Sequence, residues 1–235
     1  MFAILNKNSK IKLTQDNVSV NNTKNSSGTG SFVRDNQKSL AFIAIGIVVL
    51  ILLYVGYQRF YLAPRAERAT NEMFKAEEYI TVDSLQKRAI DGDGSYPGFK
   101  EIAEEYSNTK SANIANAYLG GLYLREGKYQ EAAAALEKYS DTGSSVLDPL
   151  VTGLLGDAYS ELKDYKRAAD QYKKAANKSE NSFTTPLFLK KLGLVYEAQN
   201  DFKSALESYK QIKTAYPQSY EASIIDGYIA RCATH

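Results

Sequence analysis

The chain has 235 residues, of which 44% are hydrophobic and 24% are charged, and its formal net charge is only +2. This composition is typical of a folded protein, and nothing in the charge suggests a nucleic-acid binder, which would show a clustered basic face. One histidine, His235, and one cysteine, Cys232, argue against histidine-based catalysis, an internal disulfide and metal sites with several His or Cys ligands.

The first segment, residues 1–38, is rich in Asn, Ser, Thr, Lys and Gly. It has six Lys or Arg against two Asp, whereas the residues after 57 include 23 basic and 25 acidic ones. Hydrophobic periodicity is absent after Val20, so too little apolar surface is available to offset chain entropy. We therefore predict a disordered, basic, polar tail.

An apolar run of eighteen residues without charge or proline follows, from Leu40 to Tyr57. As a helix it would span roughly 27 Å, close to the hydrocarbon core of a bilayer. A cleaved signal peptide is one alternative, but the leader is long and no small-x-small cleavage pattern follows the run. A buried core helix is another, although core helices rarely lack polar positions for so long. We predict a transmembrane helix over 39–61.

The orientation of this helix rests on the basic residues around it. Positive charges near the two ends are almost balanced, with the short basic tail favouring a cytoplasmic N-terminus. The C-terminal domain would then be periplasmic.

Residues 62–96 are predicted to form a helical linker and a loop. The loop, DGDGSYPG from Asp91 to Gly98, resembles a calcium-binding loop in its acidic residues and glycines. However, Tyr96 stands where such a loop needs glycine and Ile102 where it needs glutamate, so we predict an ordinary turn and no metal.

Three segments after residue 97 repeat one pattern, with glycines 36 and 37 residues apart. Each has Leu-Gly, then Tyr three residues after the glycine, an aromatic residue nine after it, Ala twelve after it and a bulky residue sixteen after it. The residues are Leu119, Gly120, Tyr123, Tyr129, Ala132 and Leu136; Leu155, Gly156, Tyr159, Tyr165, Ala168 and Tyr172; and Leu192, Gly193, Tyr196, Phe202, Ala205 and Tyr209.

This pattern predicts stacked helical hairpins. Leu and Tyr four residues apart share one helical face, and Gly with Ala allow two helices to cross closely. Short turns (REGK, ELKD, AQND) join the helices of each pair. Because one hairpin cannot bury its own apolar stripe, successive hairpins would share a continuous core. We predict an all-α fold, with an α-solenoid of three to four hairpins over 97–235.

The three copies resemble the tetratricopeptide repeat family. They depart from it at the early Trp-type position, and only the third copy ends with the family's proline, Pro217. The resemblance implies a concave protein-binding surface formed by the first helix of each hairpin. The family's groove positions carry over to Arg125, Asp157, Ser160, Glu161, Lys190, Leu194 and Glu197. The positions of the family's carboxylate clamp hold Ala117 and Gly121, so that binding mode is not expected.

The whole arrangement of tail, membrane helix and repeats resembles the YfgM-type family of single-pass inner-membrane proteins. The stretches YVGYQRFYLAPR, GDGSYPGFKEI and NSFTTPLFLKKLGLVYE are similar to its Bacteroidota members. This resemblance implies a non-enzymatic scaffold of the bacterial inner membrane that accompanies the SecYEG translocon, a periplasmic chaperone or emerging polypeptides, without a cofactor. An assembly scaffold for another envelope machine, in secretion or division, is the alternative. An enzyme using carboxylates such as Glu104 and Glu105 is the third hypothesis.

Overall fold

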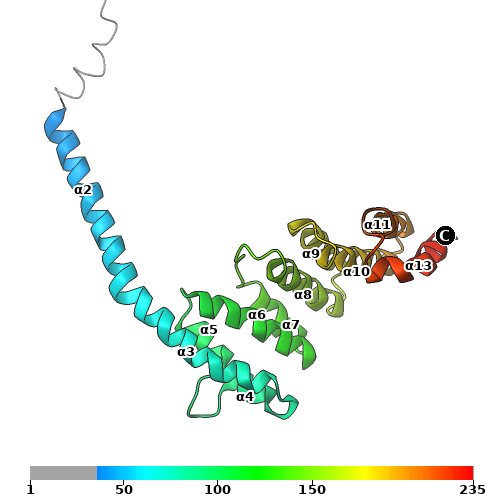
Figure 1. Ribbon diagram of the computed structural model, residues 1–235, viewed down its shortest axis with the longest axis horizontal. Helices are drawn as coiled ribbons and strands as arrows, with labels where there is room; N and C mark the ends of the chain where they lie inside the picture. Colours follow the sequence, from blue (N-terminus) through cyan, green and yellow to red (C-terminus); the bar gives the residue numbers. More distant parts are fainter. Residues whose placement is uncertain (1–35, 235) are drawn as a thin grey trace, which may run out of the picture. The chain divides into compact units, whose positions relative to one another are not determined.

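The computed structural model describes residues 36–234, so most of the predicted tail lies outside the described residues. The described chain is formed by helices, turns and bends, without a strand between residues 36 and 234. It divides into two compact units, Met1–Tyr54 and Val55–His235, which are described separately. The predicted all-α class is therefore confirmed (Figure 1).

The described part of the first unit lies within helix α2 (Gln37–Gly56), which has no buried residue. From Ile43 to Val55 its Leu, Ile and Val side chains are about half to two-thirds exposed on every side of the helix. A helix that is apolar all round requires apolar surroundings. The continuous helical stretch Gln37–Ile80 is the one helix of the described chain that is long and apolar enough to cross a membrane.

The second unit is a stack of helices whose bounds follow. They are the π-helix η1 (Tyr57–Leu62), α3 (Ala63–Ile80), the 3-10 helix η2 (Asp83–Leu85), α4 (Gln86–Asp91), α5 (Phe99–Glu105), α6 (Lys110–Arg125), α7 (Tyr129–Leu136), α8 (Leu147–Glu161), α9 (Tyr165–Lys178), α10 (Thr184–Ala198), α11 (Phe202–Ala215), α12 (Tyr220–Ile224) and α13 (Asp226–Cys232). Helices α6 to α11 form three successive hairpins (Figure 1).

Each repeated glycine makes room for the bulky residue sixteen positions later. A Cβ on Gly120 would lie 2.2 Å from Leu136, and a Cβ on Gly193 would lie 2.2 Å from the Tyr209 ring. The pair Gly156 and Tyr172 is arranged in the same way. The two helices of a hairpin therefore approach until the side chain of the second touches the backbone of the first, which is why the spacing recurs.

The other repeated positions line the core between hairpins. Ala132, Ala168 and Ala205 are fully buried. Buried positions further include Leu119, Tyr159 and Leu192, and partly buried ones are Tyr123, Tyr129, Leu155, Tyr165, Tyr196 and Phe202. Pro217 differs, because it is exposed just after α11. Small residues at the crossings and larger ones around them let the hairpins share one core.

The turns inside the three hairpins have the same backbone geometry. Gly127, Lys163 and Asn200 occupy the equivalent turn position with φ of 71°, 61° and 60°. The next residue starts the second helix, and the side chains of Asp164 and Asp201 accept a hydrogen bond from the backbone of that helix. Left-handed backbone suits Gly and Asn, but it is unfavourable for Lys163.

Replacing Lys163 with glycine is expected to raise the free energy of unfolding by about 0.5–1 kcal/mol. The left-handed conformation costs a non-glycine residue about 1–2 kcal/mol, part of which the freer unfolded chain offsets. Chemical denaturation of the detergent-solubilised chain would measure the change. Lys166→Gly, at an exposed position within α9, should instead lower stability by about 1 kcal/mol. Equal effects of the two changes would contradict this explanation.

Helix α3, which the sequence suggested as a linker, packs within the second unit. Ala69, Ala76 and Tyr79 are buried in a cluster with residues of α5 and α6. Thr70 and Ser111 hydroxyls lie 3.0 Å apart, and the Arg65 guanidinium donates to the Glu105 carbonyl. The compact unit that begins at Val55 therefore includes α3 together with the helices after residue 97.

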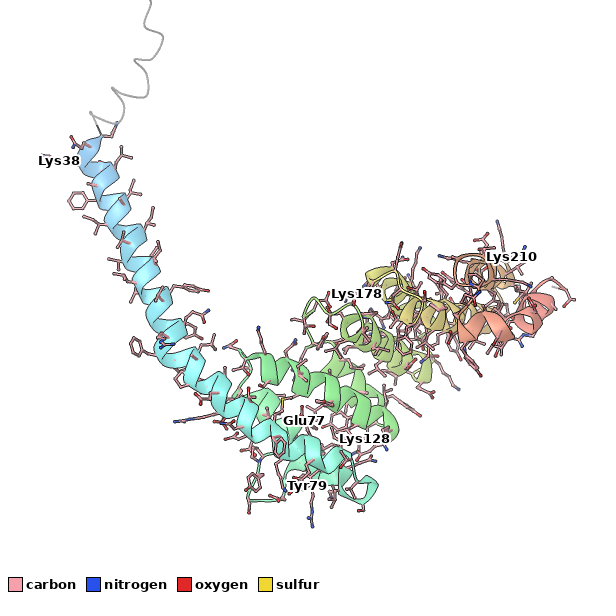
Figure 2. The ribbon with its side chains drawn as sticks, in the orientation of Figure 1. Lys38, Glu77, Tyr79, Lys128, Lys178 and Lys210 are labelled. Carbon is pink, nitrogen blue, oxygen red and sulfur yellow. The ribbon has the colours of Figure 1, made fainter. Side chains whose placement is uncertain are left out.

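The loop after α4 is closed by Asp93. Its carboxylate accepts hydrogen bonds from the Tyr79 hydroxyl (2.5 Å) and from the backbone amides of Ser95 and Tyr96 (2.8 Å each). These bonds, with that of Tyr79 the strongest, lower the pKa of Asp93 to about 2. Figure 2 labels Tyr79 near the end of α3. Asp93 therefore stabilises the turn.

The C-terminal segment after Ser219 forms two short helices, α12 and α13. The chain bends at Ile225, which is fully buried, and this separates α12 from α13. The bend lets α13 pack against α11 and buries Cys232. Arg231 of α13 forms two hydrogen bonds with the Glu197 carboxylate, at 2.6 and 2.7 Å. The end of the stack is thus covered by a folded-back helix.

Candidate protein-binding groove

A groove of about 860 Å³ lies between the first helices of the first two hairpins, α6 and α8. Its walls come mainly from these two helices, with single contributions from α3, α7, α9 and α10. The lining includes Ile114, Ala117, Tyr118, Gly121, Arg125, Leu150, Leu154, Asp157, Ser160, Glu161 and Lys191. The groove lies wholly within the unit Val55–His235.

The two ends of the groove differ in polarity. Ile114 and Tyr118 come from the first half of α6, and Leu150 and Leu154 from the first half of α8. The charged side chains on the wall, such as Arg125 and Glu161, come from the last turns of the same helices. An occupant would therefore meet apolar surface where the helices start and charged groups where they end.

Asp157 is held in place by its neighbours. Its carboxylate accepts a hydrogen bond from the Tyr172 hydroxyl (2.6 Å) and two from the Lys191 ammonium (2.6 and 2.7 Å). Burial, followed by the nearby Asp157 charge, raises the pKa of the Tyr172 hydroxyl. Lys191 lies on α10 in the third hairpin, and Asp157 lies on α8 in the second. Their ion pair therefore joins these two hairpins at the charged end of the groove.

Four of the seven residues suggested by the family resemblance line this groove: Arg125, Asp157, Ser160 and Glu161. Lys190, Leu194 and Glu197 lie on α10 and are not part of its wall. Leu194 is 41% exposed, whereas Glu197 already accepts hydrogen bonds from Arg231 and from Tyr209 (2.5 Å). A binding role for all seven stays a prediction.

The apolar lining of the groove was missed in the sequence. The signal was present in α8, which has apolar residues on two faces. Ala158 and Tyr159 are buried in the core, while Leu150 and Leu154 are only partly buried on the groove side. Ala117 and Gly121 were noted as replacing a carboxylate clamp; in the structure they keep the groove open, since no atom lies within 4 Å of a Cβ on Gly121.

The comparison with family models agrees with the repeated helical hairpins. The family model described as tetratricopeptide repeat matches residues 119–183 and 154–220. Residues 119–220 therefore carry tetratricopeptide-type repeats. No curated protein matches the chain. Among solved structures, the chain is similar to BtubC (BKLC) from P. vanneervenii, with 15% identity, a TM-score of 0.42, and coverage of 74% of this chain and 66% of that one.

Tetratricopeptide repeats serve as protein-binding scaffolds, and nothing here indicates enzymatic activity. The carboxylates considered for catalysis, Glu104 and Glu105, are exposed at the end of α5. They do not line the groove. The repeats therefore point to the groove, and not to an acid pair, as the site of interest.

Proposed function

We propose that this chain is a membrane-anchored scaffold that binds segments of other proteins in the groove between α6 and α8. It would act as an ancillary subunit of the Sec translocon, or as a chaperone-like factor for translocated proteins. The anchor would be a single pass through the bacterial inner membrane, with the N-terminus cytoplasmic and the repeats periplasmic. The supporting observation is an open, partly apolar groove in a chain that has one helix suited to a membrane.

The chemistry of the groove favours polypeptide over a fixed anionic ligand. Arg125 and Lys191 are matched in the wall by Asp157 and Glu161, so the wall carries no excess of one sign. The apolar end offers leucine, isoleucine and tyrosine side chains. Such a mixture suits a segment with a few apolar side chains, because each one buried contributes about 1.5–3 kcal/mol.

Replacing Gly121 with phenylalanine is expected to block the groove without disturbing the fold. The new ring would extend into open space, because no atom lies within 4 Å of a Cβ at this position. With a photo-crosslinking amino acid at Ser160, the yield of protein adducts in native membranes should fall about tenfold, equivalent to about 1.4 kcal/mol of binding free energy.

Gly121→Ala is the matched control for this experiment. It adds one methyl group at the same position and should retain the adducts. If Gly121→Phe keeps the same adducts in the same yield, the groove is not the binding site.

The identity of the adducts tests the proposed role. Recovery of SecY or a periplasmic chaperone would support the translocon-associated function. Recovery of a secretion or division component would favour the alternative, an assembly scaffold for another envelope machine. Recovery of cytosolic proteins alone would exclude both roles in the periplasm.

Protease treatment of spheroplasts tests the orientation. Protease added outside the inner membrane should cleave the periplasmic repeats. In a chain of the opposite orientation, the membrane would protect the repeats from cleavage. Carbonate extraction should leave the chain in the membrane fraction, and its release would contradict the membrane anchor.

A further inference from the structure

Three exposed apolar side chains recur at the helix starts of successive repeats. Val146, Phe183 and Tyr220 are separated by 37 residues each, and they are 45%, 66% and 71% exposed. Val146 and Phe183 are the N-cap residues of α8 and α10, and Tyr220 is the first residue of α12. We refer to these three residues as the apolar edge.

The fold itself gives no reason for apolar residues at these positions. The helix starts at Val146 and Phe183 are capped by earlier side chains, because the Ser144 hydroxyl accepts from the Leu147 amide (3.1 Å) and the Asn181 side-chain oxygen from the Thr184 amide (2.7 Å), so neither apolar side chain has a capping role. At the starts of α6 and α12 the N-cap residue itself accepts this hydrogen bond. Thr109 accepts from the Ala112 amide and Ser219 from the Ala222 amide, at 3.1 Å each. The apolar edge therefore calls for a contact outside the chain.

Contacts between repeats place the edge residues along one end of the stack. The Asn181 side chain, in the loop before Phe183, donates to the Ser145 carbonyl in the loop before Val146 (3.2 Å). Lys178, labelled in Figure 2, pairs with Asp141 of the same earlier loop (2.5 Å). The Lys190 ammonium lies 5.9 Å from the centre of the Tyr220 ring.

The same end of the stack holds the beginning of α3. Thr70 of α3 contacts Ser111 at the start of α6, and Arg65 contacts Glu105 just before it. Asn113 of α6 forms two hydrogen bonds of 2.7 Å with the backbone of Ser140, in the loop that leads to Val146. The start of α3 and the loop before α8 thus flank the start of α6.

The end of the apolar run belongs to this unit as well. Val55, Gly56 and Tyr57 directly precede the residues that lead into α3, and Phe60 in η1 is 84% exposed. The chain consequently leaves the lipid at the end of the stack that carries the apolar edge. Exposed aromatic and apolar side chains next to lysines are typical of surfaces that insert into the bilayer interface.

We infer that the apolar edge rests on the surface of the bilayer in which the chain is anchored, with Val146, Phe183 and Tyr220 inserted among the lipid headgroups. The inference rests on the membrane anchor of the proposed function. It adds a second lipid contact, which orients the repeats so that the inter-repeat loops face the lipid and the turns within the hairpins face away.

The test uses the full chain reconstituted into vesicles of phosphatidylethanolamine and phosphatidylglycerol with brominated acyl chains. A fluorophore on Ser182→Cys, beside Phe183, reports contact with lipid. A fluorophore on Lys163→Cys, in the turn at the other end of the same repeat, is the control. Both carry Cys232→Ala, which removes the native thiol. Bromine quenching should be several-fold stronger at 182 than at 163.

The combined variant Val146→Ser, Phe183→Ser and Tyr220→Ser should reduce quenching at 182 to the level seen at 163. All three side chains are at least 45% exposed, so the thermal midpoint of this variant should change little, which separates loss of contact from loss of fold. The variant Val146→Leu, Phe183→Tyr and Tyr220→Phe should retain the quenching.

Equal quenching at the two sites, or a serine variant quenched like the wild type, would overturn the inference. Carbonate extraction of the vesicles is performed first. A chain released by carbonate contradicts the anchor itself, whereas a retained chain without quenching at 182 contradicts only the contact of the apolar edge.

Discussion

Gly193→Ala is expected to lower the free energy of unfolding by about 1–2 kcal/mol, although alanine is the better helix former. The added methyl would lie 2.2 Å from the ring of Tyr209. That ring is fully buried, and its hydroxyl is held by Glu197 at 2.5 Å, so the ring cannot move aside without losing contacts. Overpacking of this kind costs about 1–3 kcal/mol, and helix propensity returns about 1 kcal/mol at most.

Gly121→Ala is the matched control for this prediction. It also lies within the first helix of a hairpin, but its Cβ would meet no atom within 4 Å. It should therefore raise stability by about 0.5–1 kcal/mol through helix propensity alone. Chemical denaturation of the two variants in detergent measures both effects. A similar change in both variants would mean that the close approach of α10 and α11 is unimportant.

Asp148→Ala is expected to lower the free energy of unfolding by about 3 kcal/mol, because charged hydrogen bonds and unpaired buried donors are costly to lose. Asp148 is only 4% exposed, in the first turn of α8. Its carboxylate accepts hydrogen bonds from the Tyr139 hydroxyl (2.6 Å), the Thr142 amide and hydroxyl (3.0 and 2.8 Å) and the Gly143 amide (2.8 Å). Removing it would leave the Tyr139, Thr142 and Gly143 donors without this acceptor.

Asp141→Ala is the control in the same loop. Asp141 is 57% exposed in its ion pair with Lys178, so its removal should cost about 0.5 kcal/mol or less. Thermal unfolding of the two variants would compare them directly. Equal losses would show that the buried carboxylate does not organise the loop.

The same carboxylate predicts an acid dependence of stability. Burial raises the pKa of Asp148, but the bonds from Tyr139, Thr142 and Gly143 outweigh it and lower the pKa to about 2, from a usual 3.8. Because the folded-state pKa is depressed, its contribution is full above pH 4 and is lost as the pH falls from about 4 towards 2. Asp148→Asn should flatten the fall in stability in that window and leave the slope between pH 5 and 7 unchanged.

The stack of hairpins could be predicted from the sequence because its determinants are local and repeated. Gly120, Gly156 and Gly193 each meet a residue sixteen positions later in the same hairpin. A contact at a fixed short separation leaves a periodic trace in the sequence. The apolar run from Leu40 is equally readable, since its length and uniform hydrophobicity depend on no other segment.

The groove and the placement of α3 were decided by contacts between elements far apart in the chain. In the sequence, Leu150 cannot be distinguished from a core leucine. The packing of α6 against α8 places it on the wall of the groove. Glu197 looks like a groove residue until α13 folds back and Arg231 pairs with it. Neither contact occurs at a fixed separation along the chain, so no periodic sequence pattern indicates it.

The sequence by itself thus determined the helical hairpins, the crossing glycines and the apolar helix, since each arises from forces within a short stretch of chain. Tertiary structure alone decided which apolar side chains remain uncovered, as at Phe183, and which charges are already paired, as at Asp157. Exposure and pairing are properties of neighbours in space, and a side chain acquires those neighbours only when the repeats stack.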